Sequence, residues 1–101
     1  MEKFGIYGKL IAKEGEREQL ATILLEAAES MDTLGDCELY LVSVAPADPN
    51  SVYVYEVWSS ESAHQASLTL ESTQTLIQRA KPILAGMERI STFVPRGGKG
   101  M

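Results

Sequence analysis

The sequence predicts an α+β fold of the ferredoxin-like, split β-α-β type, in which helices cover one face of an antiparallel four-stranded sheet. Two observations predict it. Short segments rich in Val, Ile, Tyr and Phe are typical of strands, whereas other segments repeat apolar residues at helical spacing. Along the chain they follow the order strand, helix, strand, strand, helical pair, strand. With 101 residues and 45% hydrophobic content, residues 1–101 have room for one domain with a modest core.

The first half of the chain predicts a strand, a helix and a hairpin. Residues 4–12 form a strand whose alternate side chains are mostly apolar on both sides. Residues 14–33 form an amphipathic helix, with acidic residues in its first turn and a glycine just past its end. Residues 37–45 and 51–58 form two strands, since the prolines and the Asp and Asn residues of 46–50 favour a turn.

The second half predicts two helices and a final strand. Ser59 and Ser60 can accept hydrogen bonds from the free amides of a helix over residues 61–70. Ser72 can cap a further helix that reaches Leu84, and Pro82 kinks or ends it. The last strand covers residues 87–95. A glycine-rich tail over residues 96–101 follows, and we expect it to be mobile or to lie on a partner subunit.

Several strands are apolar on both alternate sets of side chains, although the chain has helices for only one face. Leu39 and Leu41 alternate with Tyr40 and Val42, for example. An uncovered second face would form a larger apolar patch than soluble monomers usually expose. We therefore expect a homodimer that packs sheet against sheet, stabilised by roughly 25 cal/mol per Å² of apolar area removed from water.

Composition excludes several classes of function. The net charge of −5 leaves no basic surface for nucleic acid or anionic lipid, and no apolar run reaches the ~20 residues that cross a bilayer. The single cysteine, Cys37, cannot form an internal disulfide and is more often a small buried residue than a nucleophile. No basic and apolar leader precedes Phe4. We expect a cytoplasmic protein.

The candidate site lies where the third strand runs into the following helix. Val54, Glu56 and Trp58 point to the same side of that strand, because strand side chains alternate. His64 lies in the first turns of the helix, and Ser67 shares its face. An imidazole with a pKa near neutrality can take a proton from a bound phenol, and an indole can stack on the ring of that phenol. We predict a pocket with His64 as base and Trp58 as platform.

A simpler interpretation remains open for each of these residues. His64 can lie at the solvent edge of its helix, and Trp58 can belong to the core. A buried carboxylate needs a partner. For Glu56 an ion pair with Arg79, Arg89 or Lys9 is therefore favoured over catalysis, and binding remains its expected role at the pocket.

Metal and cofactor sites have little support. One His and one Cys without ligand spacing leave only carboxylates to hold a metal. The run Gly97-Gly98-Lys99-Gly100 lacks the spacing of a phosphate-binding loop, and no helix follows it. We predict no metal and no cofactor.

Three segments resemble the antibiotic biosynthesis monooxygenase family: YGKLIAKEGEREQLATIL, YEVWSSESAHQASLTL, and LIQRAKPILAG with the final GGKG. The resemblance implies a dimeric α/β barrel and oxygen insertion without metal or flavin. In anthrone-oxidising members, a Trp at the strand end and a polar residue six positions on line the pocket, which correspond to Trp58 and His64. Many relatives place a histidine where this chain has Ser67. A haem-degrading branch is less similar, because its Asn, Trp and His correspond to Gly8, Ser67 and Ile77.

Two functions follow from this resemblance and from the pocket. One is a cofactor-independent monooxygenase that oxidises a small phenol, quinol or anthrone-like substrate with O2. In that reaction the deprotonated substrate itself gives an electron to oxygen. The alternative is a non-catalytic dimer that binds a small hydrophobic molecule in the same pocket and is stabilised by it.

Overall fold

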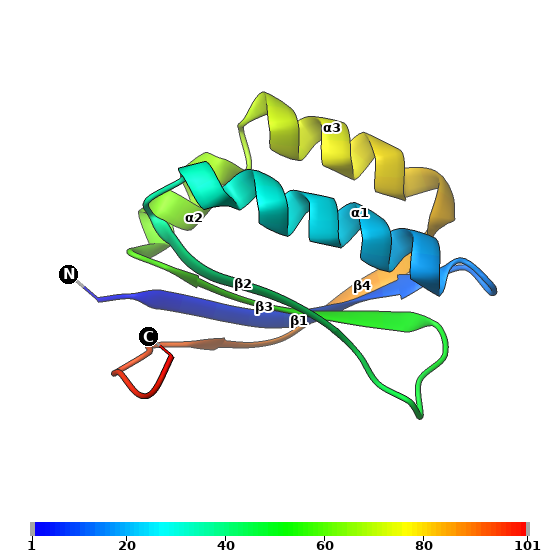
Figure 1. Cartoon of the computed structure of the whole chain (residues 1–101), viewed down its shortest axis with the longest axis horizontal. Helices are drawn as coiled ribbons and strands as arrows, with labels where there is room; N and C mark the ends of the chain where they lie inside the picture. The colour runs from blue at the N-terminus through cyan, green and yellow to red at the C-terminus, as the bar shows by residue number, and fades with distance from the viewer. Residues whose placement is uncertain (1, 101) are drawn as a thin grey trace.

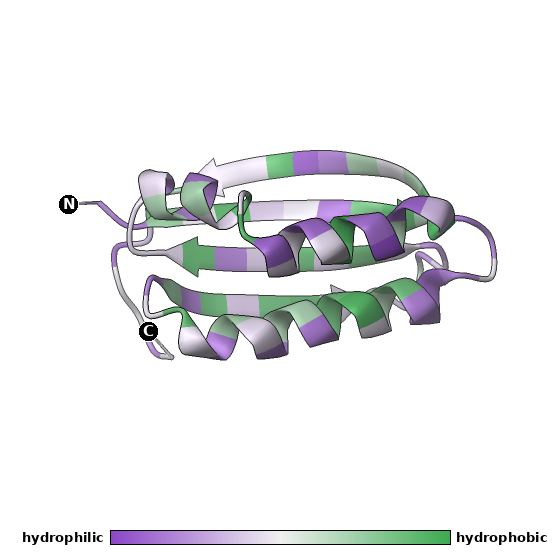
Figure 2. Cartoon of the chain, turned by 90° about the horizontal axis from the view of Figure 1, so that it is seen from above, coloured by the Kyte–Doolittle hydropathy of each residue, from purple (hydrophilic) through white to green (hydrophobic). Residues whose placement is uncertain are grey.

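The computed structural model describes residues 2–100 and has an antiparallel four-stranded sheet with helices on one face (Figure 1). This confirms the predicted α+β ferredoxin-like fold. Seen from above, the two longer helices run side by side over the sheet (Figure 2). The elements in chain order are β1 (Phe4–Ala12), α1 (Arg17–Ser30), β2 (Cys37–Val44), β3 (Ser51–Trp58), α2 (Glu61–Ser67), α3 (Glu71–Ala80) and β4 (Leu84–Phe93), with short 3-10 turns at Met31–Thr33 and Lys81–Ile83.

The strand order β2-β3-β1-β4 places β1 and β3 at the centre of the sheet. The connection through α1 carries the chain from β1 past β3 to β2, and the helical pair carries it from β3 to β4. In the register of the three neighbouring strands, Glu56 on β3 lies between Ile6 on β1 and Tyr40 on β2. A carboxyl group therefore lies in the middle of the sheet.

Helix boundaries differ from the predicted ones where local chemistry decides them. Helix α1 begins at Arg17 rather than at Glu14, because the chain turns first at Gly15, whose φ of 82° suits glycine. Ser60 caps α2 as predicted, since its Oγ accepts a hydrogen bond from the amide of Ala63 at 3.1 Å. Ser59 instead donates to Asp36 Oδ1 at 2.7 Å.

The prediction that Ser72 caps the second helix is wrong. The N-cap of helix α3 is Leu70, two residues earlier, so that the helix begins at Glu71 and Ser72 lies within its first turn. The helix ends at Ala80, and Pro82 lies in the 3-10 turn that follows, consistent with the predicted break. Strand β4 starts at Leu84, three residues before the predicted start, because Leu84 pairs with Ala12 at the end of β1.

The two faces of the sheet have different surroundings. On one face Val52 and Val54 pack against Leu20 and Leu24 of α1, and this cluster forms the core.

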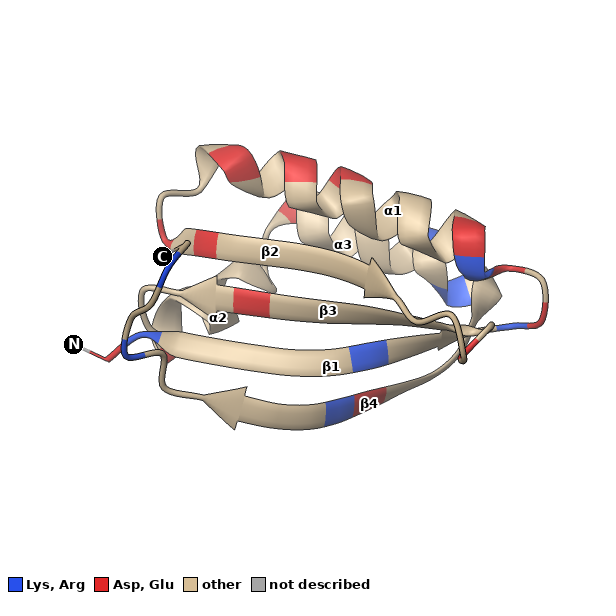
Figure 3. Cartoon of the chain, turned by 60° about the horizontal axis from the view of Figure 1, so that its bottom comes forward, with Lys and Arg blue, Asp and Glu red and all other residues tan. Residues whose placement is uncertain are grey.

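Acidic residues recur along α1, whereas charged residues are few along the strands (Figure 3). No helix within residues 2–100 is both long enough and apolar enough to cross a membrane.

On the opposite face, which we call the open face, none of the described helices covers the strands. Four aromatic side chains form a continuous row there. The ring of Tyr7 lies 6.2 Å from that of Tyr53 and 6.1 Å from that of Tyr55, and the ring of Tyr55 lies 5.9 Å from that of Phe93. Leu41 is cross-strand partner to Tyr55 and is 53% exposed.

Candidate functional site

A cavity of about 190 Å³ lies between the sheet and the three helices. Its walls are mainly apolar, and the polar groups that reach it are few. The apolar lining includes Leu10, Leu24, Val54, Leu68, Leu76 and Met87. The polar lining includes Ser30, Tyr40, Glu56, His64, Ser67 and Thr73. An apolar cavity with a few polar groups is the usual form of a small-molecule site.

A second hollow of about 280 Å³ adjoins this cavity on the side of β1 and β4. Glu56, His64, Val54 and Leu68 are among the residues that line both spaces. Arg89 on β4 lines only the second one. Glu56 and His64 therefore lie at the boundary of the two spaces.

His64 is held within the structure rather than at the solvent edge of α2. Its side chain is 7% exposed, and its ring lies 5.3 Å from the ring of Phe4 and 5.7 Å, edge-on, from that of Trp58. Burial, and then the positive charge of Arg89, lower the pKa of His64, while Glu61 opposes this effect. The imidazole is therefore neutral at pH 7 and able to accept a proton.

Glu56 does not form the predicted ion pair with Arg79, Arg89 or Lys9 within the described residues. Lys9 contacts Glu88 on the open face at 3.7 Å, and Arg79 contacts Glu26 at 2.6 Å. Glu56 Oε1 instead accepts a hydrogen bond from the Trp58 indole nitrogen at 3.0 Å. Burial raises the pKa of Glu56, and the hydrogen bond from Trp58 offsets part of that rise.

Trp58 lies beside the cavity but not among its lining residues. Its side chain is 1% exposed and lines a different hollow of about 240 Å³, together with Leu34, Asp36 and Ala66. Its two contacts with the candidate site are the edge of its ring against His64 and its hydrogen bond to Glu56. In this geometry Trp58 acts through these two residues rather than as a surface for a ligand in the cavity.

Ser67 and Val54 both line the cavity, in different roles. The Ser67 hydroxyl donates to the carbonyl of His64 at 2.6 Å, so its proton is used to hold the last turn of α2. Val54 is 5% exposed and forms part of the apolar floor. The structure thus brings four of the five sequence-predicted residues into one cavity and places Trp58 behind Glu56.

Two further polar residues belong to the site. Tyr40 on β2 is the cross-strand partner of Glu56, and burial followed by the charge of Glu56 raises the pKa of its phenol. Tyr40 is one of four strand tyrosines, and alternation along β2 places it on the same face as Val42, which packs against the core. Thr73 Oγ1 on α3 is buried without a hydrogen-bond partner among the described residues. No sequence signal marks Thr73, since its position depends on how α3 packs.

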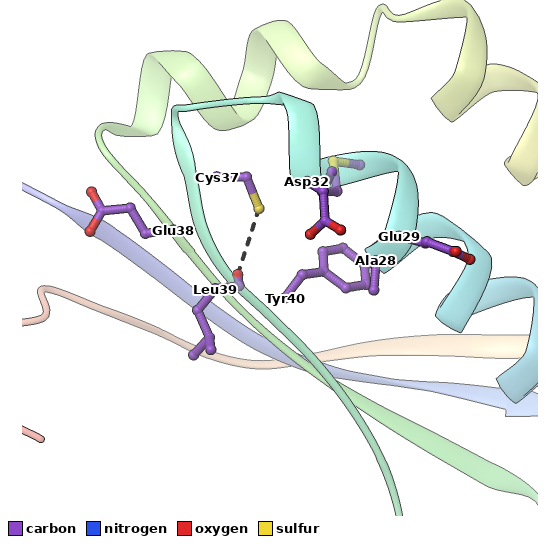
Figure 4. Close-up of a pocket in the computed structure, with 8 residues that line it drawn as sticks. Ala28, Glu29, Asp32, Cys37, Glu38, Leu39 and Tyr40 are labelled. Carbon is purple, nitrogen blue, oxygen red and sulfur yellow. Dashed lines mark hydrogen bonds between the residues drawn. The ribbon is translucent and has the colours of Figure 1, made fainter. Parts of the chain in front are cut away.

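Another hollow, of about 340 Å³, lies between the C-terminal end of α1 and β2 (Figure 4). It is lined by Asp32, Glu38 and Cys37, whose thiol contacts the carbonyl of Leu39 at 3.7 Å. Burial, and then the charge of Glu56, raise the pKa of Cys37 to about 11, so the thiol stays protonated and unreactive at pH 7.

Within residues 2–100, no group of three or more His, Cys, Asp or Glu is placed to hold a metal ion.

Comparison with known proteins identifies the family. The family model described as antibiotic biosynthesis monooxygenase matches residues 4–79, which include every lining residue of the cavity and the adjoining hollow except Met87, Glu88 and Arg89. The chain belongs to the antibiotic biosynthesis monooxygenase family. A search of curated proteins found no match.

Solved structures agree with this family assignment. A protein of Chloroflexus aurantiacus J-10-fl, named as a candidate antibiotic biosynthesis monooxygenase, is 36% identical, with 95% of each chain covered and a TM-score of 0.82. A candidate family member from Deinococcus radiodurans is 22% identical over 95% of this chain and 93% of its own, with a TM-score of 0.76. A protein of Shewanella oneidensis shares the fold at 17% identity and a TM-score of 0.84, with 93% and 91% of the two chains covered.

Proposed function

We propose that this member of the family is a cofactor-independent monooxygenase that oxidises a small phenol, quinol or anthrone-like substrate with O2. One observation carries the proposal: a largely apolar cavity presents a buried, neutral imidazole, that of His64, to whatever occupies it. The family supplies the class of reaction. The cavity supplies the conditions that a deprotonated aromatic needs, namely a base and an environment poor in water.

In this proposal His64 removes the acidic proton of the substrate, and the resulting anion gives an electron to O2. For an anthrone, the ring CH2 becomes C=O, and the second oxygen atom leaves as water with the two hydrogens. His64 returns its proton during that loss of water. Val54 and Leu76 exclude solvent from the anion, and Ser67 holds the turn of α2 that carries His64.

We further propose that the protein is a homodimer through the open face. The row of Tyr7, Tyr53, Tyr55 and Phe93 is aromatic and continuous, and Phe93 and Leu41 are 42% and 53% exposed. Covering such a face yields about 25 cal/mol per Å² of apolar area removed from water. The cavity lies on the other side of the sheet, so each protomer would keep its own site.

The test is incubation with anthrone under ¹⁸O2, with oxygen uptake and product mass as readouts. We expect one labelled oxygen atom per product molecule and a rate at least tenfold lower for His64→Ala. The matched control is Thr22→Ala, on the exposed side of α1, which should keep the wild-type rate. Stabilisation of the protein by anthrone without oxygen uptake would favour the binding function instead.

A further inference from the structure

Glu56 carries a partly buried carboxyl group that the proposed base chemistry does not use. It lies in the central strand β3, between Ile6 and Tyr40, and lines both the cavity and the adjoining hollow. No lysine or arginine within residues 2–100 forms an ion pair with it. A carboxyl group in such a place needs a reason beyond folding, because a Leu or Val there would avoid the desolvation cost.

The indole of Trp58 fixes the orientation of this carboxyl group. Its nitrogen donates to Oε1 at 3.0 Å, and the indole itself is held by nearly complete burial. The second oxygen, Oε2, has no hydrogen-bond partner among the described residues and remains available to a ligand. His64 lines the same two spaces, so a ligand can contact the imidazole and this oxygen together.

We propose that Glu56, positioned by Trp58, is a hydrogen-bond donor that recognises a carbonyl oxygen of the ligand. A carboxyl group can donate only when it is protonated. Burial raises the pKa of Glu56, and a ligand that fills the cavity removes the remaining water around it, which favours the protonated form further.

The charges around Glu56 do not oppose this protonation strongly. On β2 it faces the neutral phenol of Tyr40 and the protonated thiol of Cys37, and on α2 it faces the neutral imidazole of His64. Arg89 on β4 lines the adjoining hollow, whereas Lys9 on β1 borders it but is paired with Glu88 on the open face.

His64 and Glu56 together define the class of ligand. His64 accepts a proton from a hydroxyl group, and Glu56 donates one to a carbonyl oxygen, so the ligand carries both groups on one ring system. Hydroxyaryl ketones meet this requirement. The role of His64 in this pairing rests on the proposed function, whereas the preference for a carbonyl depends on Glu56 alone and needs no turnover.

The test compares two probes that differ only in the carbonyl: 5-hydroxy-1-tetralone and 5,6,7,8-tetrahydro-1-naphthol. Dissociation constants are measured by calorimetry at pH 5.5 and pH 8.5. For the wild-type protein we expect the ketone to bind about tenfold tighter at the lower pH, the effect of one good hydrogen bond. This preference should shrink as the pH rises and the carboxyl group ionises, because a carboxylate repels the carbonyl oxygen.

Variants separate the donor role from a structural one. Glu56→Gln keeps an N–H donor, so it should keep most of the preference and lose its pH dependence. Glu56→Leu should bind both probes equally, because it has no donor for the carbonyl oxygen. Trp58→Phe should reduce the preference for the ketone, because it removes the hydrogen bond that orients Glu56.

Equal binding of the two probes by the wild-type protein, or no binding of either, would overturn the proposal. So would a preference that persists in Glu56→Leu or that grows with pH. These measurements need no turnover. A protein that lacks oxygenase activity but prefers the ketone would therefore contradict the proposed function and still support the carbonyl preference.

Discussion

The buried hydroxyl of Thr73 gives a quantitative test of how the cavity is built. Thr73 Oγ1 is buried in the wall formed by α3 and has no hydrogen-bond partner among residues 2–100. Burying an unpaired polar group of this kind costs about 1–3 kcal/mol. Thr73→Val replaces the hydroxyl with a methyl group of nearly the same shape, and the two residues have similar helix propensity. The variant should therefore be more stable than the wild type.

The expected gain can be measured by thermal and urea unfolding of the ligand-free protein. For a domain of about 100 residues, each kcal/mol shifts Tm by about 4–8 °C, so we expect Tm to rise by at least about 4 °C. The matched control is Thr75→Val, two residues further along α3 at an exposed position, where the same substitution should change Tm little. An unchanged or lower Tm for Thr73→Val would refute the reasoning and mean that the hydroxyl has a partner in solution.

Three further predictions concern the interface, the α2 cap and the base. Leu41→Asp places a charge on the open face and should convert the proposed dimer to a monomer, as measured by sedimentation velocity. A wild-type protein that is itself monomeric would contradict the proposed interface. Ser60→Ala removes the hydrogen bond to Ala63 and should lower the free energy of unfolding by about 1 kcal/mol in urea titrations; no loss would mean that the cap is not used. Arg89→Gln removes a positive charge that lowers the pKa of His64. The pKa of His64 should therefore rise in the variant, as measured by NMR titration of the imidazole. A lower pKa in the variant would contradict the proposed influence of Arg89 on His64.

Patterns of residue type predicted the fold because each element carries its own signal. The apolar stripe of α1, with Leu20 and Leu24 facing the sheet, could be recognised from spacing alone. The end of α3 could also be located, since Pro82 cannot continue a helix. The start of α3 could not, because Leu70 takes the cap position without a side-chain hydrogen bond, and a nearby serine offered the more usual signal.

The partner of Glu56 was missed for a geometric reason. Side chains alternate along β1, so Lys9 faces away from the helices, whereas Glu56 on β3 faces toward them. Strand alternation correctly placed Val54 and Glu56 on the cavity side. It could not show that Trp58, at the very end of β3, turns beneath α2 and bonds to Glu56, since this depends on where α2 packs.

The central claim is that an aromatic ligand binds in the cavity between the sheet and the helices, against His64. The most direct measurement is NMR titration of the wild-type protein with 5-hydroxy-1-tetralone, with assigned methyl and imidazole signals. We predict saturable shifts for the methyl groups of Val54 and Leu76 and for the His64 ring, which line this space. Shifts confined to Leu34 and Ala66 around the hollow beside Trp58, or no saturable shifts, would contradict the account.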